Sequence, residues 1–444
     1  MASENPQKEY IQATNVKEKK VDNPQKEFIH QTDSWPQDIQ SSRRAPTWLK
    51  AFKSRAKKEP RRKRKAENKG VKSYNPQAYF ILEKLGKIKA RESRYQKIQR
   101  LFPLYMIIAA ICVPLSILLA MSIGAVHIPF LDCYHIFIDK LLGQSTMDVS
   151  PAIAAIVWQA RLPRILMSAV IGAGLALCGV TMQSSIQNPL ADPYIIGTST
   201  GAQLGATLVV FLGTVKSVSW ASTMSIGAGA FIGAMVASIA VLGIANTGGR
   251  MTSVKLVLGG AVLNMVFGSF TSMIFALFPR NEALQSVGFW LTGSLRTINW
   301  ESFGYLPIII LIAVIFFITQ TRTMNVMMMG DEAATTLGVD TARSRLVFMI
   351  IAALVIGFIV STCGIIGYVG LIIPHIARGL VGTDHRKMLP FAIVTGALFL
   401  IWCDVFARTI LVNGELSLAL VTSTVGAPLL LYRIVKQSFS SSVG

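Results

Sequence analysis

Charge and paired cysteines are scarce in this sequence, and each scarcity argues against a class of protein. Only 15% of the 444 residues are charged and 52% are hydrophobic, whereas a soluble domain usually carries about 25% charged residues. The five cysteines form no CxxC pair and mostly fall within apolar runs, which argues against a zinc site or a disulfide framework. The first 30 residues are polar throughout, so we expect membrane insertion to begin at an internal apolar segment.

Two sequence signatures of an energy source for transport, a nucleotide-binding loop and a proton relay, are also missing. No GxxxxGK[ST] phosphate loop occurs, so any ATP would be hydrolysed by a separate subunit. The apolar segments hold no run of carboxylates of the kind that proton-coupled transporters use as relays. Asp404 is the one acidic residue deep in an apolar stretch, and Arg408, four residues later, predicts a structural ion pair. We predict neither catalytic residues nor a metal site nor a cofactor bound by this chain.

The charge that is present divides the chain into parts. Residues 1–103 hold 26 Lys/Arg and 11 Asp/Glu, and so supply +15 of the formal net charge of +20. This basic tail contains a duplicated segment, residues 5–14 and 23–32, and its composition favours disorder. Apolar positions among the lysines and arginines of residues 77–102 suit either an interfacial helix on anionic lipid or a solvated linker. We expect a transmembrane domain at 104–437 and a short C-terminal tail at 438–444.

From residue 104 the chain is one apolar segment after another, which predicts an all-α polytopic membrane protein. The ten predicted spans are 104–123, 162–184, 195–214, 221–243, 254–278, 301–320, 344–363, 366–379, 389–410 and 416–437. The 366–379 span is short for a full crossing, so we expect it to be packed inside the bundle. Glycine clusters such as Gly227 through Gly233 predict close helix–helix contacts.

The distribution of basic residues predicts the orientation of these helices. With the tail inside, the inner loops hold ten of the 17 cations beyond residue 103, among them Arg250, Arg343 and Arg345. The positive-inside rule then places both termini in the cytoplasm. Arg161, Arg164 and Arg408 fall on the outer side against this bias, and a negatively charged partner would explain them.

Several segments, in order along the chain, resemble the FecCD/BtuC-type permeases of ABC importers for iron–siderophore, haem and vitamin B12. The resemblance covers roughly residues 104–437 and implies the type II importer architecture. It is carried by Arg161-Leu162-Pro163-Arg164, Asn188-Pro189-Leu190-Ala191-Asp192-Pro193, Trp290-Leu291-Thr292-Gly293-Ser294-Leu295, Gly330-Asp331-Glu332-Ala333 with Leu337-Gly338-Val339, Gly367-Tyr368-Val369-Gly370-Leu371-Ile372-Ile373-Pro374-His375-Ile376-Ala377-Arg378 and Gly426-Ala427-Pro428. One departure is clear: Glu415 is followed by Leu416-Ser417-Leu418-Ala419, without the family's proline and glycine.

The resemblance implies partners and a power source. Residues 330–339, here called the coupling segment, would seat in a groove of an ATPase dimer, which binds the ATP and Mg²⁺. Asp331 and Glu332 would make polar contacts there, while Gly330, Ala333, Leu337 and Gly338 would shape the apolar fit. Closure of the ATPase would then rock the permease between two states.

The resemblance also assigns residues to docking and to the path. Arg161, Arg164 and Arg408 would meet acidic residues of an extracytoplasmic solute-binding protein, because guanidinium pairs with carboxylate in a bidentate geometry. The path would follow the axis of a permease dimer, formed with the same chain or a paralogue, along the fifth and tenth helices. Asn188, Leu190, Thr252 and Ser253 would form its cytoplasmic gate. For Met265, Met273 and Phe275, which could line the same route, ordinary core packing is our expectation.

The resulting interpretation is a permease that carries a ferric siderophore across the cytoplasmic membrane of a bacterium. Haem or cobalamin is the alternative cargo, and a secondary transporter driven by an ion gradient is a more remote alternative. In a third interpretation the chain is a membrane-anchored binding module, and its basic tail binds nucleic acid or anionic lipid. The tail lacks the aromatic interleaving of a single-strand binder, so we expect no nucleic-acid partner.

Overall fold

In the computed structural model of the chain, the described residues are 100–442, with gaps at 125, 144–148, 215–223, 249–250, 279–281 and 412–413. The predicted tail up to residue 99, with most of the predicted interfacial helix at 77–102, lies outside these residues. The described part is helical and contains no strand. The all-α prediction is therefore confirmed.

Helices occupy every predicted span. Seven helices of the described part are long and apolar enough to cross a membrane. They are Arg100–Ser122, Pro151–Ile186 (α7, Pro151–Ala155; η1, Ile156–Arg161; α8, Leu162–Ile186), Ile226–Ala245 (α11), Ser253–Leu277 (α12), Glu301–Thr319 (η3, Glu301–Phe303; α14, Leu306–Thr319), Thr341–Cys363 (α17) and His385–Thr409 (α19). Three further helices match the remaining spans: α9 (Thr198–Thr214), α18 (Val369–Val381) and α20 (Leu418–Ser442). Because α20 continues to Ser442, the predicted C-terminal tail at 438–444 is largely helical.

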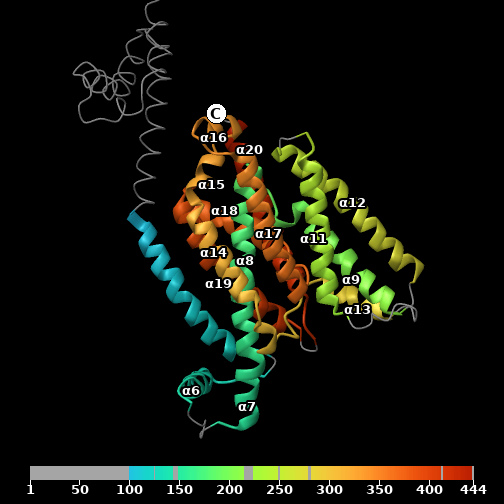
Figure 1. Cartoon of the computed structure of the whole chain (residues 1–444). Helices are drawn as coiled ribbons and strands as arrows, with labels where there is room; N and C mark the ends of the chain where they lie inside the picture. Colours follow the sequence, from blue (N-terminus) through green and yellow to red (C-terminus); the bar gives the residue numbers. More distant parts are fainter. Residues whose placement is uncertain are drawn as a thin grey trace, which may run out of the picture. The chain divides into compact units, whose positions relative to one another are not determined.

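Short elements fill the connections between these helices. They are α6 (Phe130–Leu141), the 3-10 turns η2 (Pro193–Ile196) and η3 (Glu301–Phe303), α13 (Glu282–Leu291), α15 (Thr321–Met327) and α16 (Asp331–Thr336). Figure 1 shows α8 in the middle of the bundle, with α6 and α7 at one end and α16 at the other. We refer to these as the α6 end and the α16 end.

The second span begins earlier than its sequence predicts. Ser150 caps α7 (Pro151–Ala155), and the chain continues through a π-helical stretch, η1 (Ile156–Arg161), into α8 (Leu162–Ile186). A span that began at residue 162 would place Pro163 in the first turn, where a proline costs no hydrogen bond. The π stretch lies directly before Pro163, and within it the Leu162 N–H reaches back five residues to the Val157 carbonyl.

Close backbone contacts between glycines hold the bundle together. Gly172 on α8 faces Gly396 on α19, where a Cβ at Gly396 would lie 2.5 Å from the Gly172 carbonyl oxygen. Gly201 and Gly205 on α9 face Gly233 and Gly229 on α11 in the same way. Small residues let helix backbones approach and gain dispersion energy that larger side chains would prevent. The packing role predicted for the glycine cluster at 227–233 is thus confirmed.

The buried core follows the same helices. Residues of α8, α17, α18 and α19 form its centre, including Leu175, Phe348, Ile373 and Leu400. The short helix α18 is largely buried, as expected for a segment too short to cross alone. A second, smaller cluster at the α6 end joins the start of α8 to Ile136 of α6 and Val405 of α19.

Gly396→Ala tests the close approach of α8 and α19. The new Cβ would lie 2.5 Å from the Gly172 oxygen and 2.6 Å from Ala176 Cβ, so the helices must separate. We expect a loss of about 1–3 kcal/mol of stability, measured as a lower melting temperature of the detergent-purified protein. Gly243→Ala on α11, where nothing lies within 4 Å of the added carbon, is the matched control and should be neutral or stabilising. Equal melting temperatures for both variants would contradict the packing model.

Candidate functional site

The coupling segment is a sharply turned helix at the α16 end. After α15, Gly330 takes a φ of 104° and α16 begins at Asp331; Gly338 then closes the helix with a φ of 82°. The Val339 N–H bonds the Ala334 carbonyl at 3.0 Å, and the Gly338 N–H bonds the Thr335 carbonyl at 3.0 Å. A left-handed residue in this place is the usual way to end a helix, and glycine adopts it without strain.

The side chains of α16 divide between a buried face and an exposed face. Glu332 is exposed, and Leu337 beside the closing turn is 59% exposed. Ala334 is fully buried and fixes the inner face of the helix. Met329, which precedes the segment, is 65% exposed. The segment therefore presents an acidic and apolar surface to whatever docks on it.

Asp331 points into the bundle. Its Oδ1 lies 2.8 Å from Arg345 Nη2 and accepts a second hydrogen bond, 2.6 Å long, from Gln187 Nε2. Sequence reasoning placed Asp331 with Glu332 as a polar contact for a partner. Its engagement inside the chain leaves Glu332 as the outward acid of the pair.

Arg345 makes the contacts on the inner side of this site. It was expected in an inner loop, but it lies in the second turn of α17 and its side chain is fully buried. Its Nε donates to the Ser185 carbonyl at 2.8 Å and its Nη1 to the Met251 carbonyl at 2.7 Å, in addition to the Asp331 contact. All three guanidinium nitrogens are thus engaged. A buried charge is tolerated only when it is paired and hydrogen-bonded in this way.

The residues predicted to form the gate flank these anchored segments. Asn188 and Leu190 follow α8, and the Asn188 Oδ1 accepts the Leu190 N–H at 2.9 Å. Thr252 caps α12, and Ser253 is its first residue. All four are exposed or half-buried. Ser185 and Met251, which lie shortly before the two predicted gate pairs, both bond the Arg345 guanidinium. The gate role of the four residues stays a prediction.

The turn after this gate region is closed by Asp192. Its carboxylate accepts the Tyr194 N–H at 2.8 Å and so caps η2. Burial raises the pKa of Asp192, and the hydrogen bond from Tyr194 opposes that rise. The Tyr194 hydroxyl in turn contacts the Ile366 carbonyl at 3.1 Å, which ties the turn to the segment before α18.

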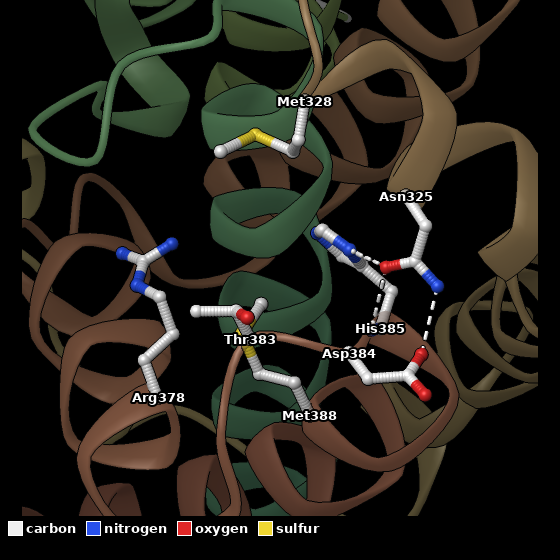
Figure 2. Close-up of a pocket in the computed structure, with 7 residues that line it drawn as sticks. All are labelled: Asn325, Met328, Arg378, Thr383, Asp384, His385 and Met388. Atoms are coloured by element: carbon white, nitrogen blue, oxygen red, sulfur yellow. Dashed lines mark hydrogen bonds between the residues drawn. The ribbon is translucent and has the colours of Figure 1, made fainter. Parts of the chain in front are cut away.

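A cavity of about 280 Å³ lies between α15, α18 and the start of α19. Figure 2 shows Arg378 on one side of it and His385 with Asn325 on the other. The His385 Nδ1 lies 2.7 Å from Asn325 Oδ1, and Asn325 Nδ2 donates to Asp384 at 2.7 Å. Arg378 binds the Gln183 side-chain oxygen. Within the described ranges, no group of three His, Cys, Asp or Glu side chains could hold a metal ion.

The three arginines predicted for docking are buried at the α6 end. Arg161, Arg164 and Arg408 are 7%, 9% and 7% exposed. Arg161 donates to the carbonyls of Met121, at 2.5 Å, and Val126. Their burial argues against direct contact with a partner, and the docking role stays a prediction.

Asp404 is the centre of an ionic cluster at this end. It is fully buried, 2.8 Å from Arg164 Nη2 and 3.6 Å from Arg408 Nε. The predicted ion pair with Arg408 is confirmed, but Arg164, 240 residues away in sequence, is the closer partner. Arg164 also pairs with Glu415 at 3.0 Å, and so holds the start of the last helix.

One face of α12 is apolar and open. Its exposed apolar residues are Val254 (65%), Leu258 (61%), Val262 (58%), Met265 (74%), Met273 (51%) and Leu277 (64%). They are three or four positions apart, except between Met265 and Met273, where the exposed residue is Ser269. For this chain alone, the expectation of core packing is wrong for Met265 and Met273, whereas Phe275 is half-buried. The helical spacing produces a continuous stripe, which suits contact with lipid, with a second chain or with a large apolar solute.

Sequence reasoning missed Arg345, Gln187 and Gln183. Each contacts a residue that is distant in sequence, so no local spacing could reveal it. Arg345 looked like any basic residue at the start of a helix. The only available signal was its place: two residues after Arg343, on the opposite side of a helix whose neighbours on that side are apolar.

Asp404→Asn tests the ionic cluster. The change leaves Arg408 buried beside a neutral partner and leaves Arg164 with Glu415 alone, so we expect a loss of about 3–5 kcal/mol of stability. Thermal unfolding of the purified protein measures this loss. Glu301→Gln, which neutralises an exposed carboxylate, is the control and should change the melting temperature little. A melting temperature for Asp404→Asn as high as that of the control would show that the cluster contributes no stability.

The family model described as the FecCD transport family matches residues 111–436. The chain is 36% identical to the uncharacterized ABC transporter permease YvrB of Bacillus subtilis, over 72% of this chain and 90% of that protein. It is also 36% identical to the cobalamin import permease BtuC of Halobacterium salinarum, over 62% and 72% of the two chains. Other relatives are named as permeases for hemin, in Yersinia pestis, and molybdate, in Haemophilus influenzae.

Among solved structures, the chain is similar to one described as an inward-facing conformation of a metal-chelate type ABC transporter. The two share 28% sequence identity and a TM-score of 0.63. The match covers 75% of this chain and 99% of that chain.

Proposed function

The chain belongs to the FecCD transport family and is the membrane permease of an ABC importer, and on that premise we propose that it carries a ferric siderophore across the cytoplasmic membrane of a bacterium. ATP hydrolysis belongs to a separate subunit. The observation that carries the rest of the proposal is the coupling segment. It turns Glu332 and Leu337 outward while Asp331 is anchored to a buried arginine.

The ATPase dimer would dock on the α16 end. Glu332 offers a carboxylate, and Met329 and Leu337 offer apolar contacts on a surface that is otherwise open to water. Ala333, half-buried, and the glycines at 330 and 338 keep this surface low and sharply turned. ATP and Mg²⁺ would bind the ATPase, which transmits its closure through this contact.

The path would run between two permease chains. The apolar stripe of α12 supports this arrangement because it is long, continuous and unoccupied in the single chain. Leu420 and Val425 of α20 are exposed as well, at 56% and 46%. Asn188 and Leu190 from one loop, with Thr252 and Ser253 from another, would close the path at the α16 end. The second chain is either a copy of this one or a paralogue.

The solute-binding protein would dock on the opposite, α6 end. Because Arg161, Arg164 and Arg408 bond within the chain, we propose that they shape this end rather than touch the partner. Both termini would be cytoplasmic, and the basic tail would lie beside anionic lipid headgroups.

The proposed cargo rests on the family and on the character of the path. A stripe of valine, leucine and methionine suits a bulky chelate that must pass without tight binding. Haem and cobalamin are also bulky metal chelates, so they are the alternative cargoes. Molybdate, a small hard anion, fits this surface less well.

Uptake of radiolabelled cargo by cells with and without the gene tests the proposal. The panel comprises ferric hydroxamate, catecholate and carboxylate siderophores, haem, cobalamin and molybdate. We expect deletion to abolish uptake of one siderophore and the wild-type gene to restore it. Gly338→Val should restore less than about a tenth, since valine at a φ of 82° is strained by roughly 1–2 kcal/mol and distorts the docking turn.

Gly143→Val is the matched control for that experiment. Gly143 also has a positive φ, 71°, with open space around it, but it lies at the α6 end. The same backbone strain there should leave most uptake intact. Unchanged uptake of every siderophore on deletion, in cells without a paralogue, would refute the siderophore cargo. Loss of haem or cobalamin uptake instead would select the alternative.

Cysteine labelling tests the orientation. Leu337→Cys at the α16 end and Leu142→Cys at the α6 end replace side chains that are 59% and 63% exposed. A membrane-impermeant maleimide should label Cys at 142 in intact spheroplasts, and at 337 only in inside-out vesicles. The five native cysteines are buried or half-buried, so their labelling should be weak. The reverse pattern would invert the proposed topology.

A further inference from the structure

One buried guanidinium joins three parts of the chain that are distant in sequence. Arg345, with no exposed side-chain surface, contacts the Asp331 carboxylate, the Ser185 carbonyl and the Met251 carbonyl, all within 2.8 Å. Gln187 adds a second connection, since its Nε2 donates to Asp331 at 2.6 Å and to the Met327 carbonyl at 2.9 Å. The coupling segment is therefore bonded to the end of α8 from two sides.

Each of the three contacts lies next to a segment with a proposed role. Ser185 is three residues before Asn188, and Met251 is the residue directly before Thr252. Asp331 is the first residue of α16, inside the coupling segment. We call the segments at residues 188–190 and at Thr252 the gate loops. A displacement of α16 would reach both gate loops through the Arg345 side chain.

We infer that Arg345 is the positioning residue that transmits movement of the coupling segment to both gate loops. This inference rests on the proposed function, in which the coupling segment is displaced by an ATPase. It adds to that proposal a named side chain, on α17, that touches neither the ATPase surface nor the path. It predicts that the coupling segment and the two loops move as one body.

The chemistry of arginine suits this task. A guanidinium presents five donors in a rigid planar fork, so that it can hold a carboxylate and two carbonyls at fixed angles. Lysine keeps the charge but has no such fork. The Arg345 guanidinium is fully buried while the Asp331 carboxylate is partly exposed, so separating the two would leave a buried charge without its counter-charge. The connected segments therefore move together rather than apart. The exposed Glu332 could not supply such a connection, because water screens surface charges.

Arg343 provides a matched control on the same helix. It lies two residues away, its side chain is exposed, and its backbone N–H, which bonds Asp340 at 3.0 Å, is unaffected by substitution of the side chain. Arg343→Gln removes the same charge from α17 without touching the buried cluster. Any difference between the two positions therefore reports the contacts of Arg345 and not the charge of the helix end.

The experiment measures a distance within one chain of the complete complex, assembled with its ATPase in lipid nanodiscs. Spin labels are placed at Thr336→Cys in the coupling segment and at Thr247→Cys, in a Cys112→Ser background. The Thr247 carbonyl accepts a hydrogen bond from Lys255 Nζ in the first turn of α12, so a label there follows the Thr252 loop. Both threonines are exposed, which leaves room for a label. Electron–electron distances are recorded without nucleotide and with ATP and vanadate, in the wild type, Arg345→Gln, Arg345→Lys and Arg343→Gln.

We expect one narrow distance in the wild type and in Arg343→Gln, unchanged by nucleotide. In Arg345→Gln the distance should shift or broaden when nucleotide is added, while the ATPase still co-purifies. Uptake of the chelate that the wild type carries should fall about tenfold at an ATP hydrolysis rate within about twofold of wild type. The distance distribution and the uptake of Arg345→Lys should lie between those of the wild type and Arg345→Gln.

Two outcomes overturn the inference. One is a wild-type distance that changes with nucleotide, because the segments would then move separately. The other is an Arg345→Gln variant whose distance and uptake match those of Arg343→Gln. If Arg345→Gln fails to fold, Asp331→Asn, which keeps the shape and removes the counter-charge, takes its place with the same expectations. Failure of the wild type to bind any ATPase would instead refute the proposed function.

Discussion

A guanidinium taken out of water must find its counter-charge and its acceptors inside the protein, and this constraint fixes both ends of α8. At the α16 end Arg345 binds Asp331 and two carbonyls beside the last turn of α8 and the first turn of α12. At the α6 end Arg164, on α8 itself, binds Asp404 and Glu415. Each cluster connects helices that the loops alone would leave free to slide.

Between these two ends, close packing of helix backbones holds the bundle together. The glycine contacts of α8 with α19, and of α9 with α11, bring backbones close enough for dispersion to replace the hydrophobic effect, which is absent within lipid. Such contacts tolerate little change in volume, so the helices around α8 behave as a stiff body. α12 differs, because its outer face contacts nothing in the single chain and is free to contact a second one. Transport by such a molecule would change contacts between bodies, not within them.

The neighbouring acids of the coupling segment show how local geometry divides roles. Asp331 and Glu332 differ by one methylene, yet one is bonded inside the bundle and the other is exposed. Successive residues of an α-helix point about 100° apart, and α16 lies on the bundle so that this rotation turns one acid inward and the next outward. The inward acid positions the helix, and the outward acid is left for a partner.

The sequence by itself determined the class of the molecule, the ten apolar helices, the short buried α18, the glycine contacts and the ion pair of Asp404 with Arg408. All of these depend on composition or on spacings of a few residues, which hydropathy and helical periodicity express directly. The tertiary structure decided the partners that lie far apart in the chain. It gave Asp404 a closer partner in Arg164, buried the arginines assigned to docking, continued α8 back through a π-helical stretch, exposed the methionines of α12 and made Arg345 the centre of the α16 end. A buried charge selects its partner by distance in space, and residues 185, 251 and 331 meet residue 345 only after the helices have packed.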